Sequence, residues 1–220
     1  MKDKLYCLDS WLEEIIAHPI TKSNLNLDQI KIRDGVMDAT VSLRNTKGWG
    51  EWELGEKEFE KWLLNGENHA RDPEKAINEK KEIQELYKNF DLSGIIVDVG
   101  GSVGTLREFI NSKSKFVSID PHSDPLQTIS NEKIQLYPCL KKPLNYIRAC
   151  AEFLPLKSCS VDILHMRSML DHVQIPDLAI KEACRVLKDS GKLLIGIHLP
   201  MGKNNNSRVS YFLKESLRTY

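Results

Sequence analysis

The seven residues 98–104 constrain the fold of this chain more than any other segment. They read Asp-Val-Gly-Gly-Ser-Val-Gly and directly follow the apolar run Ile-Ile-Val at 95–97. The run predicts a buried strand, and the glycines predict a tight turn, because glycine tolerates positive φ and lets the backbone approach a ligand. A helix predicted over 104–112 would offer unpaired N–H groups to an anion. The segment therefore predicts a site for a nucleotide-like ligand.

The glycine spacing separates two classes of nucleotide site. Dinucleotide-binding turns follow Gly-x-Gly-x-x-Gly, whereas the glycines here are Gly100, Gly101 and Gly104, with Ser102 between them. This spacing disfavours a nicotinamide-dependent oxidoreductase. Glycine turns after strands also occur in proteins without a ligand, so the turn alone leaves both readings open.

A second apolar run, 115–119, ends at Asp120 and is followed by Pro121. The distance from Asp98 to Asp120 matches one strand–helix–strand unit. A carboxylate at this point can accept hydrogen bonds from two vicinal ribose hydroxyls. The alternative is an aspartate that caps a helix before Pro121. Together with the upstream turn, the position favours ribose contact.

Four later segments make the pattern more specific. They are Ala-Cys-Ala-Glu-Phe-Leu-Pro at 149–155, Ser-Val-Asp-Ile-Leu-His-Met at 160–166, Leu-Asp-His-Val at 170–173 and Glu-Ala-Cys-Arg-Val-Leu-Lys-Asp-Ser-Gly-Lys-Leu-Leu-Ile at 182–195. In this order, over residues 94–199, they resemble the type 11 branch of the class I S-adenosylmethionine (SAM) methyltransferases. The turn resembles that family's first motif, acidic-x-Gly-x-Gly-x-Gly, with Ser102 replacing the middle glycine. The resemblance implies an α/β fold with a doubly wound, mostly parallel, Rossmann-like sheet, and SAM as methyl donor.

The resemblance also assigns residues to the cofactor site. They are Asp98, Gly100, Gly101, Ser102, Gly104, Asp120, Pro121, Cys150, Ala151, Glu152, Met166 and Arg167. Many relatives carry aspartate where Cys150 stands, which puts the usual bond to the adenine amino group in doubt. His172 is the candidate general base, because imidazole titrates near neutral pH; its alternative role is to shape the loop. Arg167 could bind an anionic acceptor or stay solvated.

Alternating strands and helices are predicted for the core. The strands are 95–99, 115–119, 145–150, 161–166 and 192–198. The helices are 104–112, 124–131 and 176–187, the last ended by Gly191, with a loop over 134–143. Only 21 residues follow Leu199, predicted as a polar loop and a helix over 209–218, so the usual last two strands of the family have no room. An uncovered strand edge is a liability, and we expect a partner chain, a second copy or the N-terminal hairpin to cover it.

Residues 1–93 are predicted as an α+β extension of a core that spans 94–220. The extension carries a net charge of −5 and all four tryptophans, whereas the rest carries +5. Its predicted elements are a helix over 8–17, a hairpin over 29–43 that turns at Asp34-Gly35, and helices over 55–64 and 73–90. Extensions in this family often cover the substrate, so a lid is one hypothesis for the Trp-rich stretch. Packing in the core is the other.

Composition narrows the function further. The 31 basic and 31 acidic residues cancel, so nucleic acid is not expected as the main acceptor. The five cysteines form no metal-binding pattern with the six histidines and indicate a reduced, cytoplasmic protein. The N-terminus has no apolar run of signal-peptide length, and no run is long enough to span a membrane.

The sequence therefore predicts a SAM-dependent methyltransferase that acts on a small molecule, a glycan or a lipid precursor. The alternative is a SAM-binding module without catalysis that serves as an assembly subunit. Ser102, Cys150 and the missing strands motivate this alternative.

Overall fold

A computed structural model describes residues 5–25, 31–43, 49–64, 73–122, 125–126, 129–199 and 208–210. Its centre is one sheet whose parallel strands are β4 (Ile95–Val99), β5 (Lys115–Asp120), β6 (Leu144–Arg148), β7 (Val161–Arg167) and β8 (Leu187–Leu199). They lie in the order β6-β5-β4-β7-β8. The chain thus builds outward from β4 to β6 and then returns to the other side of β4, which confirms the doubly wound sheet.

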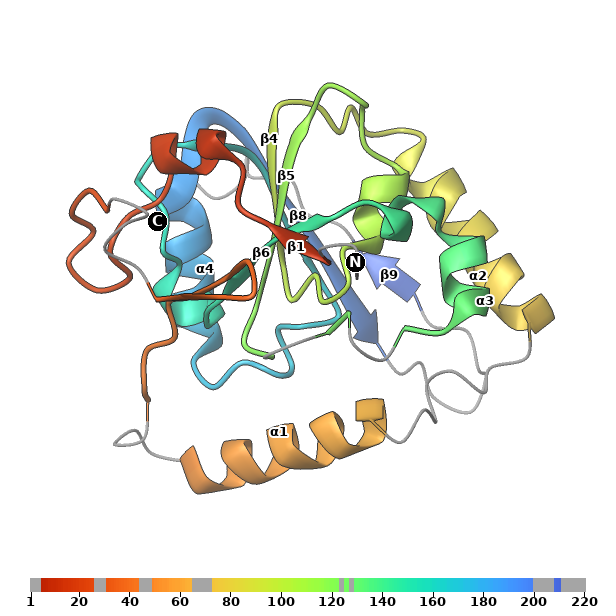
Figure 1. The fold of residues 1–220 in the computed structure, drawn as a ribbon, viewed down its shortest axis with the longest axis horizontal. Coiled ribbons are helices and arrows are strands. Elements are labelled where there is room, and N and C mark those ends of the chain that lie inside the picture. Colours follow the sequence, from red (N-terminus) through yellow and green to blue (C-terminus); the bar gives the residue numbers. More distant parts are fainter. Residues whose placement is uncertain are drawn as a thin grey trace.

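Helices cover both faces of this sheet (Figure 1). α4 (Pro176–Val186) lies on one side, and α2 (Pro73–Tyr87) and α3 (Asn131–Leu136) lie on the other. Successive side chains of β4 alternate between the faces: Val97 packs in the cluster with α4, and Ile96 packs in the cluster with α2. Both are fully buried, which is why the strand reads as a continuous apolar run.

The N-terminal strands extend the sheet beyond β6. β1 (Tyr6–Cys7) and β3 (Val36–Asp38) both pair in parallel with β6, and β2 (Ile32–Arg33) pairs antiparallel with β3. The predicted hairpin turn is confirmed: Asp34 and Gly35 have φ of 53° and 84°, as a two-residue turn of type I′ requires. A Cβ at Gly35 would lie 2.8 Å from the Tyr6 carbonyl oxygen, so glycine also permits this close approach.

The expectation that the N-terminal hairpin covers the other edge of the sheet is wrong. β9 (Arg208–Ser210) pairs antiparallel with residues 197–199 of β8, so the chain's own tail lies along this part of the edge. The expected partner chain or second copy stays a prediction. Residues 209–210 of the predicted tail helix therefore belong to a strand, and 211–218 lie outside the described residues. The physical reason is that the edge of β8 offers unpaired N–H and C=O groups to a nearby extended segment.

Two predicted helices after β4 are also wrong. In place of 104–112 there is a single 3-10 turn, η3 (Thr105–Glu108), because the Asn111 N–H donates to the Leu92 carbonyl and ends the helix early. In place of 124–131, α3 begins after Ser130, whose hydroxyl accepts from the Lys133 N–H at 3.2 Å. α3 and the 3-10 turn η4 (Pro138–Lys141) thus fill most of the segment predicted as a loop.

Several boundaries differ from the prediction. α4 ends at Val186, and Gly191 lies within β8 and does not end the helix. The residue pairs between β7 and β8 change from Val161↔Leu187 to Ile163↔Lys192. Residues 188–191 therefore have no partner residue on β7 and form a bulge, which explains why their sequence resembles a turn. The predicted helix over 8–17 is a 3-10 turn, η1 (Ser10–Glu14), and the one over 55–64 begins earlier, as α1 (Trp49–Leu64).

A partly buried ion cluster joins the N-terminal part to α4. The Glu182 carboxylate accepts from Lys22 Nζ at 2.6 Å and from Arg185 Nε at 2.6 Å. Burial alone would raise the pKa of Glu182, but these hydrogen bonds hold it below its ordinary value. A lowered pKa in the folded state stabilises the protein above the unfolded value of about 4.3, and this stabilisation disappears as the pH falls through the folded value.

Glu182→Gln is therefore expected to lower the free energy of unfolding by about 1–3 kcal/mol at pH 7, where the charged hydrogen bonds from Lys22 and Arg185 are weakened. The difference from the wild type should shrink as the pH falls toward 3, because the unfolded carboxyl then takes up its proton and the folded one begins to. Urea denaturation at both pH values measures it. Glu85→Gln is the control, because the Glu85–Lys88 pair is exposed and should change stability by about 0.5 kcal/mol or less. An equal loss for Glu182→Gln at both pH values would contradict the linkage.

Candidate functional site

A cleft of about 420 Å³ lies at the carboxyl ends of β4, β5 and β7. This is where open parallel sheets bind ligands, at the point where the strand order reverses, and the volume suits a cofactor. All the predicted site residues line it except Gly104 and Met166. Met166 is fully buried in the sheet core. Gly104 lies behind the turn, where a Cβ would be 2.8 Å from Leu144 Cδ1.

The glycine turn has the backbone geometry that its sequence predicts. Gly100 has φ of 71°, and its N–H donates to the Ile119 carbonyl at 2.8 Å. A Cβ on Gly101 would lie 2.5 Å from Asp98 Cγ and 2.7 Å from Ser118 Oγ, so no side chain fits there. Ser102 has φ of 44°, a left-handed conformation. The departure from the family's middle glycine therefore keeps the glycine-like backbone.

Asp120 is bound to this turn. Its Oδ2 accepts from the Ser102 N–H at 3.0 Å, and its Oδ1 accepts from the His122 N–H at 3.1 Å. Burial raises the pKa of the Asp120 carboxyl above its ordinary value, and the neighbouring His122 and the two N–H donors oppose the rise. Each carboxylate oxygen can accept a second hydrogen bond. The group can thus still receive two hydroxyls on the cleft side.

Cys150, Ala151 and Glu152 line the cleft at the 3-10 turn η5 (Ala151–Phe153). Glu152 is buried, and its Oε1 accepts from the backbone N–H groups of Gln174 and Ile175 at 2.9 and 3.2 Å. The carboxylate therefore caps the start of α4, which a solvated surface residue would not do. This role fixes the loop between β7 and α4 beside the cleft.

His172 and Arg167 lie on that loop and at the end of β7. The His172 side chain is about half exposed, and its Nε2 lies 3.7 Å from Asp171 Oδ2. The Trp52 Nε1–H donates to the His172 carbonyl oxygen at 2.6 Å. A residue of α1 is thereby joined to the loop after β7, and Trp52 itself lines the cleft.

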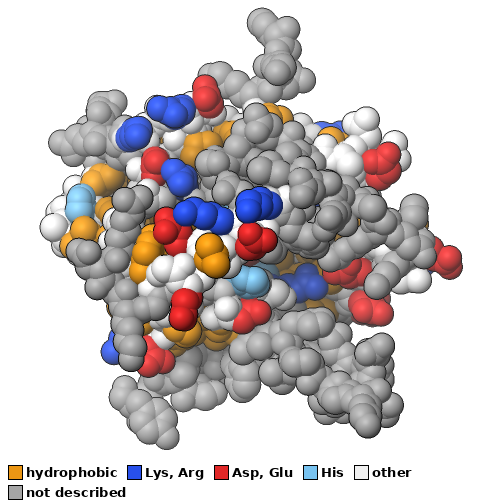
Figure 2. Space-filling view, turned by 90° about the horizontal axis from the view of Figure 1, so that it is seen from below, with side chains coloured by type: hydrophobic (Ala, Val, Ile, Leu, Met, Phe, Trp, Pro, Cys, Tyr) orange, Lys and Arg blue, Asp and Glu red, His pale blue; other side chains and the backbone are white. Residues whose placement is uncertain are grey.

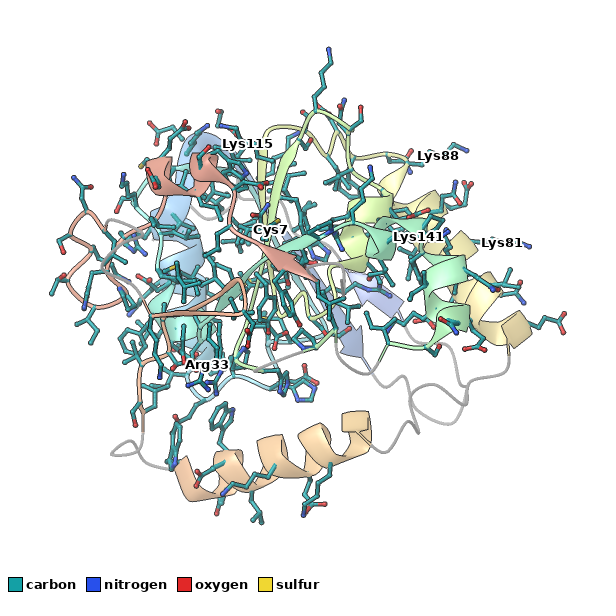
Figure 3. The ribbon with its side chains drawn as sticks, viewed as in Figure 1. Cys7, Arg33, Lys81, Lys88, Lys115 and Lys141 are labelled. Carbon is teal, nitrogen blue, oxygen red and sulfur yellow. The ribbon has the colours of Figure 1, made fainter. Side chains whose placement is uncertain are left out.

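The sequence prediction did not find Tyr87, a residue of α2 that lines the cleft. Lys81 and Lys88 extend from α2 away from the sheet (Figure 3), whereas Tyr87 is buried. Its hydroxyl lies 2.6 Å from His165 Nε2, and His165 Nδ1 lies 2.7 Å from Asp98 Oδ1. Asp98 and His165 are register neighbours on β4 and β7, so the strand endings contained a signal for this pair. No local signal points to Tyr87.

Two further properties concern the described part of the chain only. Within it, no group of three or more His, Cys, Asp or Glu side chains is arranged to hold a metal ion. No helix there has the length and apolar character to cross a bilayer.

Comparison with known proteins finds a family model that matches the segment supplying most of the cleft lining. Residues 97–195 match the methyltransferase domain family. The ubiquinone/menaquinone biosynthesis C-methyltransferase UbiE of Francisella tularensis is 29% identical over 104 residues, which are 46% of this chain and 41% of that protein. The uncharacterized protein MJ1123 of Methanocaldococcus jannaschii is 28% identical over 141 residues, which are 64% of this chain and 58% of that protein. The chain thus spans about half the length of these curated relatives.

Two solved structures resemble this chain at low identity. A SAM-dependent methyltransferase from Aquifex aeolicus is 22% identical with a TM-score of 0.44, covering 62% of this chain and 78% of that one. A SAM-dependent methyltransferase from Thermotoga maritima is 25% identical with a TM-score of 0.40, covering 68% and 61%.

Proposed function

We propose, on the premise that residues 97–195 belong to the class I SAM-dependent methyltransferase family, that the protein methylates a small molecule, a glycan or a lipid precursor. The observation that carries the proposal is the junction of the glycine turn with Asp120. There the Ser102 N–H donates to the Asp120 carboxylate at 3.0 Å. The backbone of the glycine turn therefore lies beside the carboxylate to which we assign ribose binding.

The residues of the cleft fit SAM. Gly101 leaves the space that a side chain would fill, and Asp120 keeps acceptor capacity for the ribose hydroxyls. We assign the cofactor-binding role to the predicted residues that line the cleft: Asp98, Gly100, Gly101, Ser102, Asp120, Pro121, Cys150, Ala151, Glu152 and Arg167. Gly104 and Met166 do not line the cleft, and we assign them a supporting role beneath the residues that do.

SAM supplies a methyl group on a positively charged sulfur, so the leaving group is already activated. The protein's contribution is then mainly to align acceptor and donor, which is worth up to ~7–11 kcal/mol. The half-exposed His172 remains the general base that the sequence predicts, for acceptors that must lose a proton. The bond from Trp52 to the His172 carbonyl supports the proposal that residues 1–93 cover the substrate.

The alternative function, a SAM-binding module without catalysis, has one supporting observation: Cys150 lines the cleft where many relatives have aspartate. Ser102 does not support it, because its φ of 44° keeps the geometry of the missing glycine. In our proposal the methyl acceptor is not a nucleic acid. Among the coloured side chains of the face in Figure 2, acidic groups lie beside the basic ones.

The cellular setting is also part of the proposal. All five cysteines are free thiols, and burial raises the pKa of both Cys7 and Cys139 to about 11. Such thiols stay neutral and unreactive at pH 7. We infer that the protein works in a reducing compartment such as the cytoplasm.

Titration calorimetry with SAM, S-adenosylhomocysteine and NAD tests the proposal. We expect SAM to bind near micromolar, about −8 kcal/mol, and NAD not to bind. Tritium transfer from methyl-labelled SAM to a panel of small acceptors then separates an enzyme from an inert binder. NAD binding without SAM binding would contradict the proposed function.

Asp120→Ala is expected to weaken SAM binding by about 1–3 kcal/mol, because two bonds to a charged acceptor are lost. Calorimetry measures the affinity, and thermal denaturation shows whether the variant is folded. Asp91→Ala is the control, since Asp91 is an exposed carboxylate before β4 and should leave the affinity unchanged. Wild-type affinity in a folded Asp120→Ala protein would remove Asp120 from the site.

A further inference from the structure

Arg167, at the end of β7, is a partly buried residue that lines the cleft. Within the part of the chain that the structure describes, its guanidinium forms no hydrogen bond and no ion pair. The guanidinium groups of Arg148 and Arg185, which are also partly buried, each donate to a carboxylate and to a backbone carbonyl. Taking a charge out of water costs free energy unless another group replaces the water. The Arg167 guanidinium is therefore a cation of the cleft wall that an anionic ligand would stabilise.

Arg167 lies across the mouth of the cleft from Asp120. Val99 of β4 pairs with the residue before Asp120 on β5 and with the residue before Arg167 on β7. Asp120, Gly100 and Arg167 are thus at one level on three neighbouring strands. Neighbouring strands are about 4.8 Å apart, so the backbones of Asp120 and Arg167 are roughly 10 Å apart. The ribose that we assign to Asp120 would lie at one end of this span, with the guanidinium at the other.

The Arg167 side chain lies on the face of the sheet that α2 covers. Side chains alternate along a strand, and His165, two residues earlier, meets Tyr87 of α2. Tyr137 also lines the cleft. Burial and the Glu79 carboxylate of α2 raise the pKa of the Tyr137 hydroxyl, and the Arg167 guanidinium opposes the rise. The charges of Glu79 and Arg167 therefore both reach the Tyr137 hydroxyl.

The Tyr137 hydroxyl provides a second donor. The residue is buried, and among the described residues no group forms a hydrogen bond with this hydroxyl. A guanidinium presents parallel N–H donors that match the two oxygens of a carboxylate, and a phenolic O–H can donate to one of them. A phosphate group carries nearly two negative charges, so Glu79 would repel it more strongly. The arrangement therefore favours a carboxylate over a phosphate.

This part of the cleft faces elements that the family segment does not supply. α1 and α2 lie outside residues 97–195, which match the methyltransferase domain family, yet Trp52 of α1 and Glu79 of α2 line the cleft. A cofactor is common to a family, whereas the acceptor differs from one member to another, so we assign the acceptor to the side that α1 and α2 line. Arg167 acts on Tyr137 together with Glu79 and so lies on this side.

We propose that the Arg167 guanidinium and the Tyr137 hydroxyl bind a carboxylate of the methyl acceptor, and that the acceptor is therefore an acidic molecule. The inference rests on the proposed function. The assignment of Arg167 to the cofactor site then concerns its backbone, while its side chain binds the acceptor. The positive sulfur of SAM attracts the same anion, so bound cofactor strengthens the site.

Phenylglyoxal, which modifies accessible arginine side chains, tests the proposal on the full chain. Peptide mass spectrometry gives the reaction rate at each arginine, with and without S-adenosylhomocysteine. We expect Arg167 to react faster than the paired Arg148 and Arg185. Acetate should slow the reaction at Arg167 roughly 10-fold once its concentration is about ten times its Kd, by mass action. Acetamide, with chloride to match the ionic strength, should not. Arg33 is the control, because it is exposed on β2 and does not line the cleft.

Variants test the two donors. Tyr137→Phe should need roughly 10-fold more acetate for the same protection of Arg167, since a hydrogen bond to a charged group is lost. With an acidic acceptor from the tritium assay, Arg167→Gln should raise KM roughly 10- to 100-fold. Arg167→Lys should restore only part of this, because lysine keeps the charge without the paired N–H donors. Arg33→Gln, which removes the same charge elsewhere, should leave KM unchanged.

Three results would overturn the proposal. The first is no protection by acetate, or equal protection of Arg33. The second is protection by inorganic phosphate and not by acetate. The third is protection of Arg167 by S-adenosylhomocysteine and not by 5′-methylthioadenosine, which lacks the amino-acid part, because the carboxylate of the cofactor would then occupy the guanidinium. A failure of the proposed function differs from all three: acetate protects Arg167 without cofactor, while calorimetry finds no binding of SAM or S-adenosylhomocysteine.

Discussion

Gly101→Ala is expected to lower the free energy of unfolding by about 3–5 kcal/mol and to abolish measurable SAM binding. The added Cβ would lie 2.5 Å from Asp98 Cγ, 2.6 Å from Asp98 Oδ2 and 2.7 Å from Ser118 Oγ. Neither neighbour can move freely, because Asp98 is held by His165 at 2.7 Å and Ser118 donates to the Ser102 carbonyl at 3.1 Å. Displacing the Asp98 carboxylate would break a buried, charged hydrogen bond, and that break dominates the loss.

Urea denaturation measures the stability of Gly101→Ala, and calorimetry with SAM measures its affinity. The matched control is Gly55→Ala, an exposed position of α1 where an added Cβ meets nothing within 4 Å. Since alanine is the better helix former, this control should gain up to about 1 kcal/mol. A Gly101→Ala protein with wild-type stability and affinity would show that the turn has room for a side chain.

Leu164→Ala is expected to cost about 2–5 kcal/mol of stability while the folded protein keeps its affinity for SAM. Leu164 is fully buried at the centre of β7, opposite Val97 of β4 and Leu193 of β8. Its side chain packs on the α4 face of the sheet and is not among the residues that line the cleft. Truncation leaves a cavity between strands that hydrogen bonds hold in place, so the core can collapse only in part.

The two measurements for Leu164→Ala are the same as those for the glycine variant, taken at a temperature where the protein is fully folded. Leu54→Ala is the control, because Leu54 is 66% exposed on α1 and should change stability by about 0.5 kcal/mol or less. A loss of SAM affinity in folded Leu164→Ala would mean that the core and the cleft are coupled.

The parts of the fold that the sequence predicts best are those with a strong local pattern. The run at 95–97, its glycine turn and the Asp34-Gly35 hairpin each satisfy a backbone requirement that few residues meet. Predictions fail where local signals are weak and a distant partner decides. The helix expected over 104–112 ends early because Asn111 bonds to Leu92, and residues 188–191 bulge because β8 must stay in register with β7.

The candidate site divides in the same way. Asp98 and Asp120 end neighbouring strands, so the parallel sheet brings them to one edge without further information. Glu152 was expected in the cofactor site, and its carboxylate also caps the start of α4, where it accepts from the N–H groups of Gln174 and Ile175. That contact depends on where the loop after β7 comes to lie, which the local sequence does not encode.

What the sequence determined by itself is the doubly wound sheet and the glycine turn after β4, because apolar periodicity and positive φ are properties of a few consecutive residues. Only the tertiary structure decided that β9 covers the edge of β8 and that Tyr87 of α2 meets His165 of β7, 78 positions away. Both are pairings between distant segments. Their energies depend on how whole elements pack, and such packing exists only once the chain has folded.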